Sequence, residues 1–188
     1  MHETIWLGRG GQGAFTAARL LGLSAVRFAN RQALAFPSFG PERRGAPVFA
    51  YTRIDEKTIH DRSSVRTANT AIVMDRTLLP LISPGSLRPD SLLIIDAESL
   101  SEQEIALNNQ VYAVPARQIA LEHLNSEHTN TIFLGVLNGL TGLLPDESIA
   151  AGIIAELGNG KKGQLNLSAY YYALQLGRDL AQPQQEVA

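Results

Sequence analysis

The stretch "GRGGQG", from Gly8 to Gly13, holds four glycines among six residues and stands between a short apolar run and a long one. Gly8, Gly10 and Gly13 match the pattern G-x-G-x-x-G, which joins a strand to a helix in nucleotide-binding proteins. Glycines let a phosphate group approach the N–H groups at the start of the helix, where the helix carries a partial positive charge. The loop therefore predicts a phosphate-bearing ligand, although glycines would also serve close packing of the helix on the strand.

A second stretch, "AFPSFGPERRGAPVF", carries two adjacent arginines, Arg43 and Arg44, among prolines and glycines that force an irregular path. Residues 1–54 hold seven arginines and two acids, a balance of +5, whereas the other 134 residues hold nine basic and sixteen acidic groups, a balance of −7. We expect a small anionic ligand beside the glycine loop and no nucleic acid, because the acidic remainder would repel a long polyanion. Arginines that only keep the surface soluble are the simpler interpretation.

Binding of NAD requires, besides the glycine loop, an acidic residue about 20 residues downstream that binds the ribose 2′-hydroxyl. No Asp or Glu occurs between Glu3 and Glu42, which argues against NAD. Arg27 or Arg31 could accept the 2′-phosphate of NADP instead. A stand-alone NADP-binding oxidoreductase of the Rossmann type therefore stays open as an alternative.

Other arrangements that carry chemistry are missing. The chain has no cysteine, which excludes disulfides, thiolate nucleophiles and cysteine-ligated iron–sulfur clusters of its own. His123 and His128 are five residues apart and do not share a helical face, and no carboxylate spacing completes a metal site with them. There is also no G-x-S-x-G nucleophile elbow. We therefore predict neither a catalytic residue nor a metal ligand on this chain.

The elements that must position the glycine loop follow from the hydrophobic pattern. An apolar run before the loop predicts a buried strand, and the long run after it predicts a helix packed on a sheet. Further strand-like runs stand at 70–75, 91–96 and 110–115, and helical patterns stand at 117–124, 131–144, 145–157 and 166–180. We predict an α/β fold, an open and mostly parallel Rossmann-like sheet with helices on both faces. Residues 48–63 predict an antiparallel hairpin at its edge.

Two acids, Asp75 and Asp96, each end a predicted strand where a helix should begin. Asp is a favoured helix N-cap, so capping is the main interpretation. The alternative is a role in the crevice at the carboxyl ends of the strands, where open sheets bind ligands.

Length and composition favour a single domain over residues 1–181 followed by a disordered tail at 182–188. No window reaches the roughly 18 uninterrupted apolar residues of a membrane span, and the start of the chain lacks a basic leader. We expect a cytoplasmic protein without a membrane partner. Charged residues make up 18% of the chain, which is fewer than usual and favours burial of surface against other chains.

The glycine loop in "GRGGQGAFTAARLL" and the segment around Arg43 and Arg44 together resemble the gamma subunit of 2-oxoacid:ferredoxin oxidoreductases, the family of pyruvate:ferredoxin oxidoreductase. The resemblance continues through "VPARQIALEH", "NTIFLGVLNGLTGLL" and "GKKGQLNLSAY" and covers nearly all of residues 5–172. It implies a complex that decarboxylates a 2-oxoacid such as pyruvate on thiamine diphosphate, passes electrons through iron–sulfur clusters to ferredoxin and releases an acyl-CoA.

The resemblance also implies a division of labour. The gamma chain is an open α/β unit that carries part of the coenzyme A site and is not active alone. Thiamine diphosphate and the iron–sulfur clusters are expected on partner subunits of the alpha, beta and delta types, and ferredoxin is an indirect partner. An isolated gamma chain is expected to self-associate, because a surface meant for partners would be exposed.

Carried over residue by residue, the resemblance implies coenzyme A contacts at Gly8, Arg9, Gly10, Gly11 and Gln12 in the loop that Gly13 closes, at Arg43 or Arg44, and at Asn130. The N–H groups of the loop and the arginines would bind the phosphates, and the amide would both donate and accept. The simpler interpretation of Asn130 is a helix N-cap. A purely structural subunit, whose glycines serve packing alone, is a third alternative for the whole chain.

Overall fold

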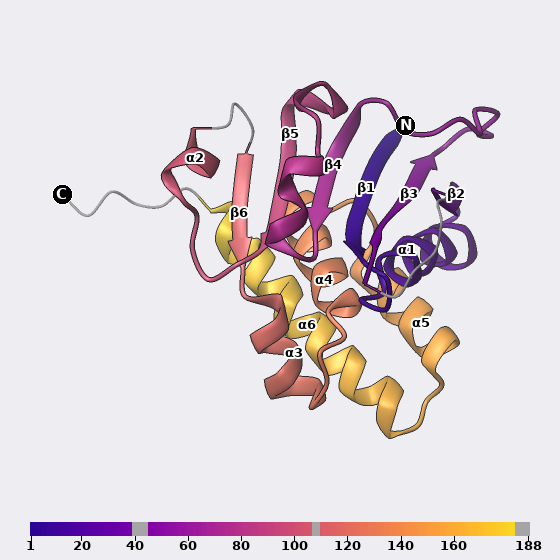
Figure 1. Ribbon diagram of the computed structural model, residues 1–188. Coiled ribbons are helices and arrows are strands. Elements are labelled where there is room, and N and C mark those ends of the chain that lie inside the picture. Colours follow the sequence, from indigo (N-terminus) through magenta and orange to yellow (C-terminus); the bar gives the residue numbers. More distant parts are fainter. Residues whose placement is uncertain (39–44, 107–109, 183–188) are drawn as a thin grey trace.

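The computed structural model describes residues 1–38, 45–106 and 110–182, and a six-stranded sheet with the order β2-β3-β1-β4-β5-β6 lies at its centre (Figure 1). The strands β1, β4, β5 and β6 are parallel to one another, whereas β3 is antiparallel to both β1 and β2. This confirms the open, mostly parallel sheet. The strands are β1 His2–Arg9, β2 Gln32–Pro37, β3 Pro47–Asp55, β4 Ala68–Val73, β5 Leu87–Asp96 and β6 Gln110–Val114.

The antiparallel part of the sheet differs from the predicted hairpin at residues 48–63. β3 is antiparallel as expected, but its partners are β1 and β2, so that Tyr51 pairs with Ile5 on one side and with Phe36 on the other. Residues 58–63 form no strand, and that part of the prediction is wrong. The physical reason is the buried Arg53, whose Nη1 donates to the carbonyl oxygens of Asp61 at 2.7 Å and of residue 63 at 2.9 Å. A side chain therefore binds the carbonyl groups that a strand would present to its neighbour.

The helices are α1 Ala14–Phe28, α2 Glu102–Ile105, α3 Ala116–Leu124, α4 Asn130–Thr141, α5 Asp146–Leu157 and α6 Lys161–Ala181, with the 3-10 helices η1 Arg76–Leu81 and η2 Pro84–Ser86. The helical patterns of the sequence are confirmed for α1, α3, α4, α5 and α6. The connections from β4 to β5 and from β5 to β6 hold less helix than expected, and their described residues form only η1, η2 and α2. Pro80 lies inside η1, where its missing N–H prevents a regular α-helix.

Each face of the sheet carries its own apolar core. Successive residues of β1 point to opposite faces, so Trp6 joins the core beneath α1, α3, α4, α5 and α6, whereas Leu7 joins the core on the other face. That second core includes Leu78 of η1 and the irregular segments beside it. Helical turns therefore cover both faces, but all five of the long helices gather on one of them (Figure 1).

Glycines bring α4 and α6 into close contact. A Cβ atom at Gly135 would lie 2.5 Å from the carbonyl oxygen of Tyr170, and a Cβ atom at Gly139 would lie 2.3 Å from that of Leu174. From Gly135 to Gly139 the chain moves one turn forward along α4, and the residue in contact moves forward from Tyr170 to Leu174 along α6. The two helices therefore run parallel. Their N-termini therefore lie at the same end of the helical layer, beside the end of β1 where the glycine loop begins.

None of the described helices combines the length and apolar composition that crossing a membrane requires. Residues 183–188, which hold most of the predicted tail, lie outside the described part of the chain. The disordered tail, the extent of the single domain and the cytoplasmic location all stay predictions.

Candidate anion-binding site

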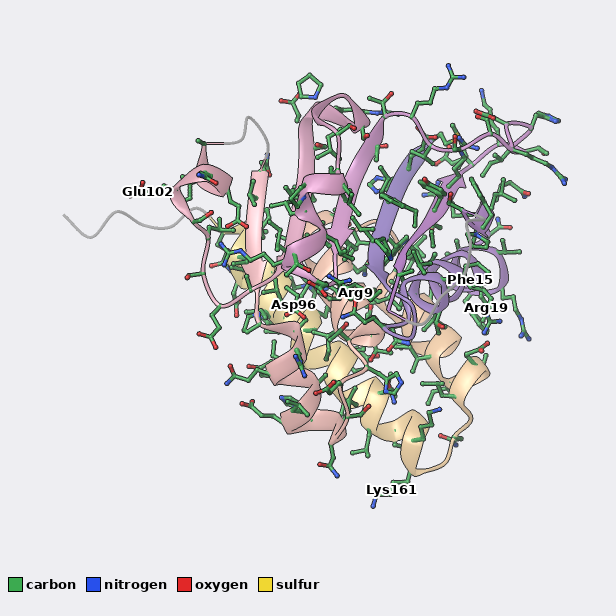
Figure 2. All side chains as sticks on the ribbon, viewed as in Figure 1. Arg9, Phe15, Arg19, Asp96, Glu102 and Lys161 are labelled. Carbon is green, nitrogen blue, oxygen red and sulfur yellow. The ribbon has the colours of Figure 1, made fainter. Side chains whose placement is uncertain are left out.

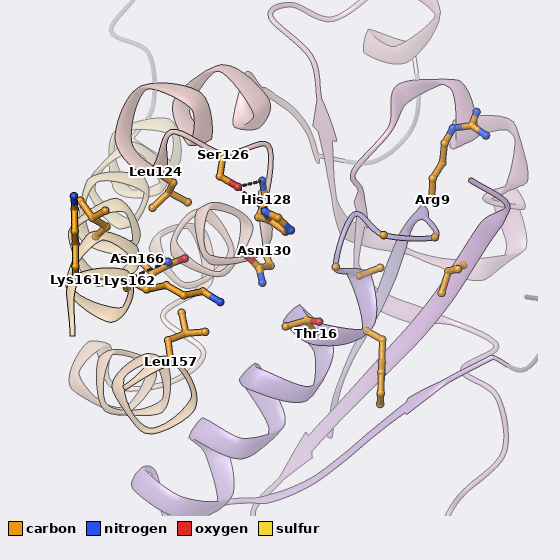
Figure 3. A pocket seen from close by; sticks show the side chains of 17 residues that line it. Arg9, Thr16, Leu124, Ser126, His128, Asn130, Leu157, Lys161, Lys162 and Asn166 are labelled. Carbon is orange, nitrogen blue, oxygen red and sulfur yellow. Dashed lines mark hydrogen bonds between the residues drawn. The ribbon is translucent and has the colours of Figure 1, made fainter. Parts of the chain in front are cut away.

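A cavity of about 810 Å³ opens between the glycine loop and the helical layer (Figure 3). It lies at the carboxyl end of β1, the side of an open α/β sheet on which ligands bind. The glycine loop, the first turn of α1, the segment between α3 and α4, and the start of α6 form its walls. The lining residues are Arg9, Gly10, Gly11, Gly13, Ala14, Phe15, Thr16, Val48, Leu124, Ser126, His128, Asn130, Leu157, Lys161, Lys162, Leu165 and Asn166.

Hydrogen bonds within the glycine loop fix its shape. The Oε1 atom of Gln12 accepts from the N–H of Arg9 at 2.6 Å, and the N–H of Gly10 donates to the carbonyl oxygen of Ala46 at 2.9 Å. Gly11 and Gly13 have φ angles of +101° and +90°, which residues with a Cβ atom rarely adopt. Gln12, which the resemblance places among the ligand contacts, thus uses its side-chain oxygen to hold the loop.

Arg9 directs its guanidinium group away from the cavity (Figure 3). Its Nε donates to Oδ2 of Asp75 at 2.6 Å, its Nη2 to Oγ1 of Thr77 at 2.7 Å, and its Nη1 to the carbonyl oxygen of Gly45 at 3.1 Å. Burial raises the pKa of Asp75, but hydrogen bonds from Thr77 and Arg9 outweigh burial and hold this pKa below its usual value. The side chain of Arg9 therefore anchors the loop to the start of η1.

Both strand-ending acids act as helix caps. Asp75 accepts from the N–H of Thr77 at 3.0 Å and caps η1. Asp96 accepts from the N–H of Arg117 at 3.3 Å, which lies in the first turn of α3. It therefore caps a helix that begins 20 residues later in the chain, and not α2, which is the next helix. Burial raises the pKa of Asp96 despite the backbone hydrogen bonds that lower it. Figure 2 shows Arg9 and Asp96 together at the edge of the sheet where the parallel strands end.

Three of the described helices, α1, α4 and α6, begin at the cavity. Their N-cap residues Gly13, Thr129 and Gly160 provide no side-chain hydrogen bond, and no acid lies in their first turns. By contrast, α5 starts elsewhere and has Asp146 and Glu147 in its first turn. Unpaired N–H groups and the partial positive charge of a helix start attract anions, so three such starts around one cavity favour a polyanionic ligand.

Asn130 lies next to the glycine loop as the first residue of α4. Its Oδ1 accepts from the N–H of Thr131 at 3.0 Å, which resembles the expected capping role, although Thr129 is the N-cap itself. A Cβ atom at Gly13 would lie 3.7 Å from Nδ2 of Asn130. This amide nitrogen has no hydrogen-bond partner within the described residues and can donate to a ligand in the cavity (Figure 3).

Lys161 and Lys162 also line the cavity, and sequence reasoning did not predict them as site residues. In Figure 3 the side chain of Lys162 extends towards Asn130 and Thr16. Neither lysine forms an ion pair with a carboxylate in the part of the chain that the structure describes. The sequence did hold a signal, because the chain has only three lysines and two of them stand side by side in "GKKG".

Of the remaining predicted residues, the structure describes Gly8, Arg27 and Arg31, and none of these three lines the cavity. Arg43 and Arg44 lie outside the described residues. Gly8 lies in β1, where a Cβ atom would be 3.4 Å from the Cβ of Met74, so its place in the structure fits close packing. Arg27 lies in the last turn of α1 and Arg31 pairs with Glu56, so both are at the far end of α1 from the glycine loop.

The comparisons with known proteins agree on one family. The family model described as "Pyruvate ferredoxin/flavodoxin oxidoreductase" matches residues 3–176. The pyruvate/ketoisovalerate oxidoreductases common subunit gamma of Pyrococcus abyssi is 37% identical over 174 residues, which cover 90% of this chain and 93% of that protein.

Two solved structures share the fold. The pyruvate oxidoreductase subunit PORC of Thermotoga maritima has a TM-score of 0.79 and 29% identity, covering 93% of this chain and 95% of that one. The 2-oxoglutarate:ferredoxin oxidoreductase of Magnetococcus marinus, with 2-oxoglutarate, coenzyme A and succinyl-CoA bound, has a TM-score of 0.73 and 20% identity, covering 96% of this chain and 31% of that one.

Proposed function

The chain belongs to the pyruvate ferredoxin/flavodoxin oxidoreductase family, and from that premise we propose that it is the gamma subunit of a 2-oxoacid:ferredoxin oxidoreductase and contributes part of the coenzyme A site. The reaction is the oxidative decarboxylation of a 2-oxoacid such as pyruvate, with electrons passed to ferredoxin. Coenzyme A supplies the thiol that takes up the acyl group. This chain binds and orients coenzyme A, and its partners carry out the redox steps.

The cavity between the glycine loop and α6 is the observation that carries this proposal. Coenzyme A bears a diphosphate and a separate 3′-phosphate, so it needs several anion-binding groups in one place. The cavity offers the starts of three helices that have no acid in their first turns, the amide of Asn130 and two lysines, whereas Phe15 and Leu165 give it apolar walls. The residues present therefore fit a phosphorylated nucleotide whose flat aromatic base lies against apolar side chains.

Within this site the glycine loop and the first turn of α1 bind the diphosphate. The N–H groups of Gly10 and Gln12 are used within the loop, so the phosphate contacts fall to the N–H groups of Gly11, Gly13 and the first turn of α1, and Asn130 donates from Nδ2 beside Gly13. Arg9 and Gln12 hold the loop in the shape that this contact requires. Arg43 or Arg44, on the adjoining segment, adds a guanidinium group to the same phosphates.

The partners follow from what this chain lacks. Without cysteine it cannot hold a cysteine-ligated iron–sulfur cluster, and it has no thiamine-type G-D-G segment followed by paired asparagines. We place thiamine diphosphate and the clusters on subunits of the alpha, beta and delta types. The assembly is cytoplasmic, and this chain gives it no activity when it is purified alone.

The stand-alone NADP enzyme receives no support from the geometry. In a dinucleotide-binding fold the strand after the first helix lies parallel to the first strand and directly beside it. Here β2 follows α1 and runs in the direction of β1, but β3 lies between the two strands and is antiparallel to both, so β2 is displaced to the edge of the sheet. Arg27 is 14 residues after Gly13 along the helix, about 20 Å away at 1.5 Å per residue. A 2′-phosphate on a nucleotide held at the glycine loop would not reach it.

Isothermal titration of the native assembly, purified through a tag on this chain, tests the proposal. Coenzyme A should bind and NADP should not. Binding of NADP without coenzyme A would favour the stand-alone enzyme, and binding of neither would favour a purely structural subunit. The tagged chain should also bring down brown, iron-containing partners, whereas the isolated chain should be colourless; iron on the isolated chain would contradict the assignment.

A further inference from the structure

We propose that Lys161 and Lys162 form a second phosphate-binding site within the cavity, one that takes the 3′-phosphate of coenzyme A and so selects coenzyme A over nucleotides that lack this group. The inference rests on the proposed function and deepens it. The observation behind it is that the cavity has two cationic sides, the glycine loop with α1 on one and the lysine pair of α6 on the other.

The position of the lysine pair in α6 does not favour the stability of that helix. Both residues stand in the first turn of α6, which has no acid, and a cation there is repelled by the positive end of the helix. Arg178, in the last turn of α6, shows the favourable arrangement and pairs with Asp146. Lys161 and Lys162 are exposed and have no carboxylate partner within the described residues, so both ammonium groups are available to a phosphate.

The packing of α6 fixes the lysines relative to the rest of the cavity. Asn166, one turn further along, is buried, donates to the carbonyl oxygen of Lys162 at 2.9 Å and accepts from Oγ1 of Thr131 at 3.0 Å. Thr131 follows Asn130 in α4, so the start of α6 is joined to the start of α4 beside the glycine loop. The cation of Lys162 and the amide of Asn130 therefore face the same cavity from fixed helices (Figure 3).

The chemistry of the two sides differs in a way that matches one ligand. Backbone N–H groups of a glycine loop and a helix start suit a diphosphate, which can lie close against the main chain. A phosphate monoester is compact and doubly charged, and lysine binds such a group as a point charge. Between the two sides, Phe15, Leu157 and Leu165 provide apolar surface for a base. Coenzyme A carries a diphosphate, a 3′-phosphate and an adenine, whereas NADP places its monoester on the 2′ position and ADP has none.

Direct titration with coenzyme A and with 3′-dephospho-coenzyme A tests the proposal. Both ligands are titrated into the unaltered assembly and into two altered assemblies. One carries the Lys161→Gln/Lys162→Gln double substitution, and the other carries Lys57→Gln. Lys57 is the third lysine of the chain and lies in the exposed turn after β3, so its replacement removes a charge outside the cavity. A Lys162→Arg variant keeps the charge in place.

The unaltered assembly should bind coenzyme A about tenfold to a hundredfold more tightly than the dephospho form, as expected for a charge-assisted phosphate contact. The double variant should lose this preference by losing affinity for coenzyme A alone, while Lys57→Gln keeps it and Lys162→Arg keeps most of it. Equal affinities in the unaltered assembly, a preference that survives in the double variant, or an equal loss for both ligands would overturn the proposal. Binding of neither ligand by the unaltered assembly would overturn the proposed function as well.

Discussion

The Nε atom of Arg9 lies 2.6 Å from Oδ2 of Asp75, and this ion pair joins the glycine loop at the end of β1 to the start of η1. Asp75→Asn removes the charge but keeps a residue that can cap η1. We expect the Kd for coenzyme A to rise about three- to tenfold, because a charge-assisted hydrogen bond that shapes the loop is lost. Isothermal titration measures the change, with Glu156→Gln as control, since that residue pairs with Arg19 outside the cavity. An unchanged Kd would show that the loop holds its shape without the ion pair.

Gly13 is a test of backbone conformation, because its φ of +90° is unfavourable for most residues whereas its surroundings leave room for a Cβ atom. Gly13→Ala should lower the free energy of unfolding by about 1 to 2 kcal/mol. Gly13→Asn should cost less, because Asn adopts the left-handed conformation more readily. Urea denaturation of the two variants gives the comparison. If the Ala and Asn variants are equally stable, strain at this turn is not what requires glycine.

Asn130→Asp should separate ligand binding from stability. An acid in the first turn of α4 interacts favourably with the helix start, so the free energy of unfolding should stay the same or rise by about 0.3 to 1 kcal/mol. The same negative charge faces the proposed phosphate site, and the Kd for coenzyme A should rise at least about tenfold. Titration and urea denaturation test the two halves, with Asn130→Ala as the uncharged control. Tighter or unchanged binding in the Asp variant would mean that no phosphate lies at this helix start.

Arg43 and Arg44 provide a prediction that rests on the sequence. Replacing both by alanine in the assembly removes up to two charge-assisted contacts, each worth roughly 1.5 to 3 kcal/mol. The KM for coenzyme A should rise about tenfold or more, while the KM values for the oxoacid and ferredoxin change little, and lysines should restore binding only in part. Steady-state kinetics with each substrate varied in turn measures the effect. Loss of co-purification with the partners, or an equal loss towards all three substrates, would instead assign the arginines to an interface.

His2 gives a pH dependence of stability. Burial, the positive charge of Arg88 and the terminal ammonium lower its pKa to about 4 from an ordinary value of 6.5. The folded chain therefore keeps His2 neutral while the unfolded chain binds a proton below pH 6.5, so stability falls as the pH drops from about 6.5 to 4. The loss attributable to this residue should be on the order of 1 to 3 kcal/mol. Urea denaturation at pH 7 and pH 4.5 should show a smaller drop for His2→Gln, and equal drops would contradict the assignment.

The local sequence determined much of this protein. The alternation of apolar residues in the strands, the helical periodicity of the five long helices and the glycines of the loop are properties of neighbouring residues, and they predicted β1, β4, β5, β6 and the strand–loop–helix unit correctly. The same motifs placed the chain in its family, a prediction that the comparisons confirm. β2 was missed because the prolines and glycines after residue 36 are typical of a loop, although Pro37 stands at the end of a strand, where its missing N–H is tolerated.

The tertiary structure decided what the loop and its neighbours do. The sequence could not show that Arg9 pairs with Asp75, 66 residues away, and so points away from the ligand site. Nor could it show that Lys162 faces the glycine loop, because that depends on the parallel packing of α4 and α6 through Gly135 and its contact with the main chain of Tyr170. A side chain's partner is set by which surfaces meet once the apolar faces are buried, and residues distant in the chain meet only then.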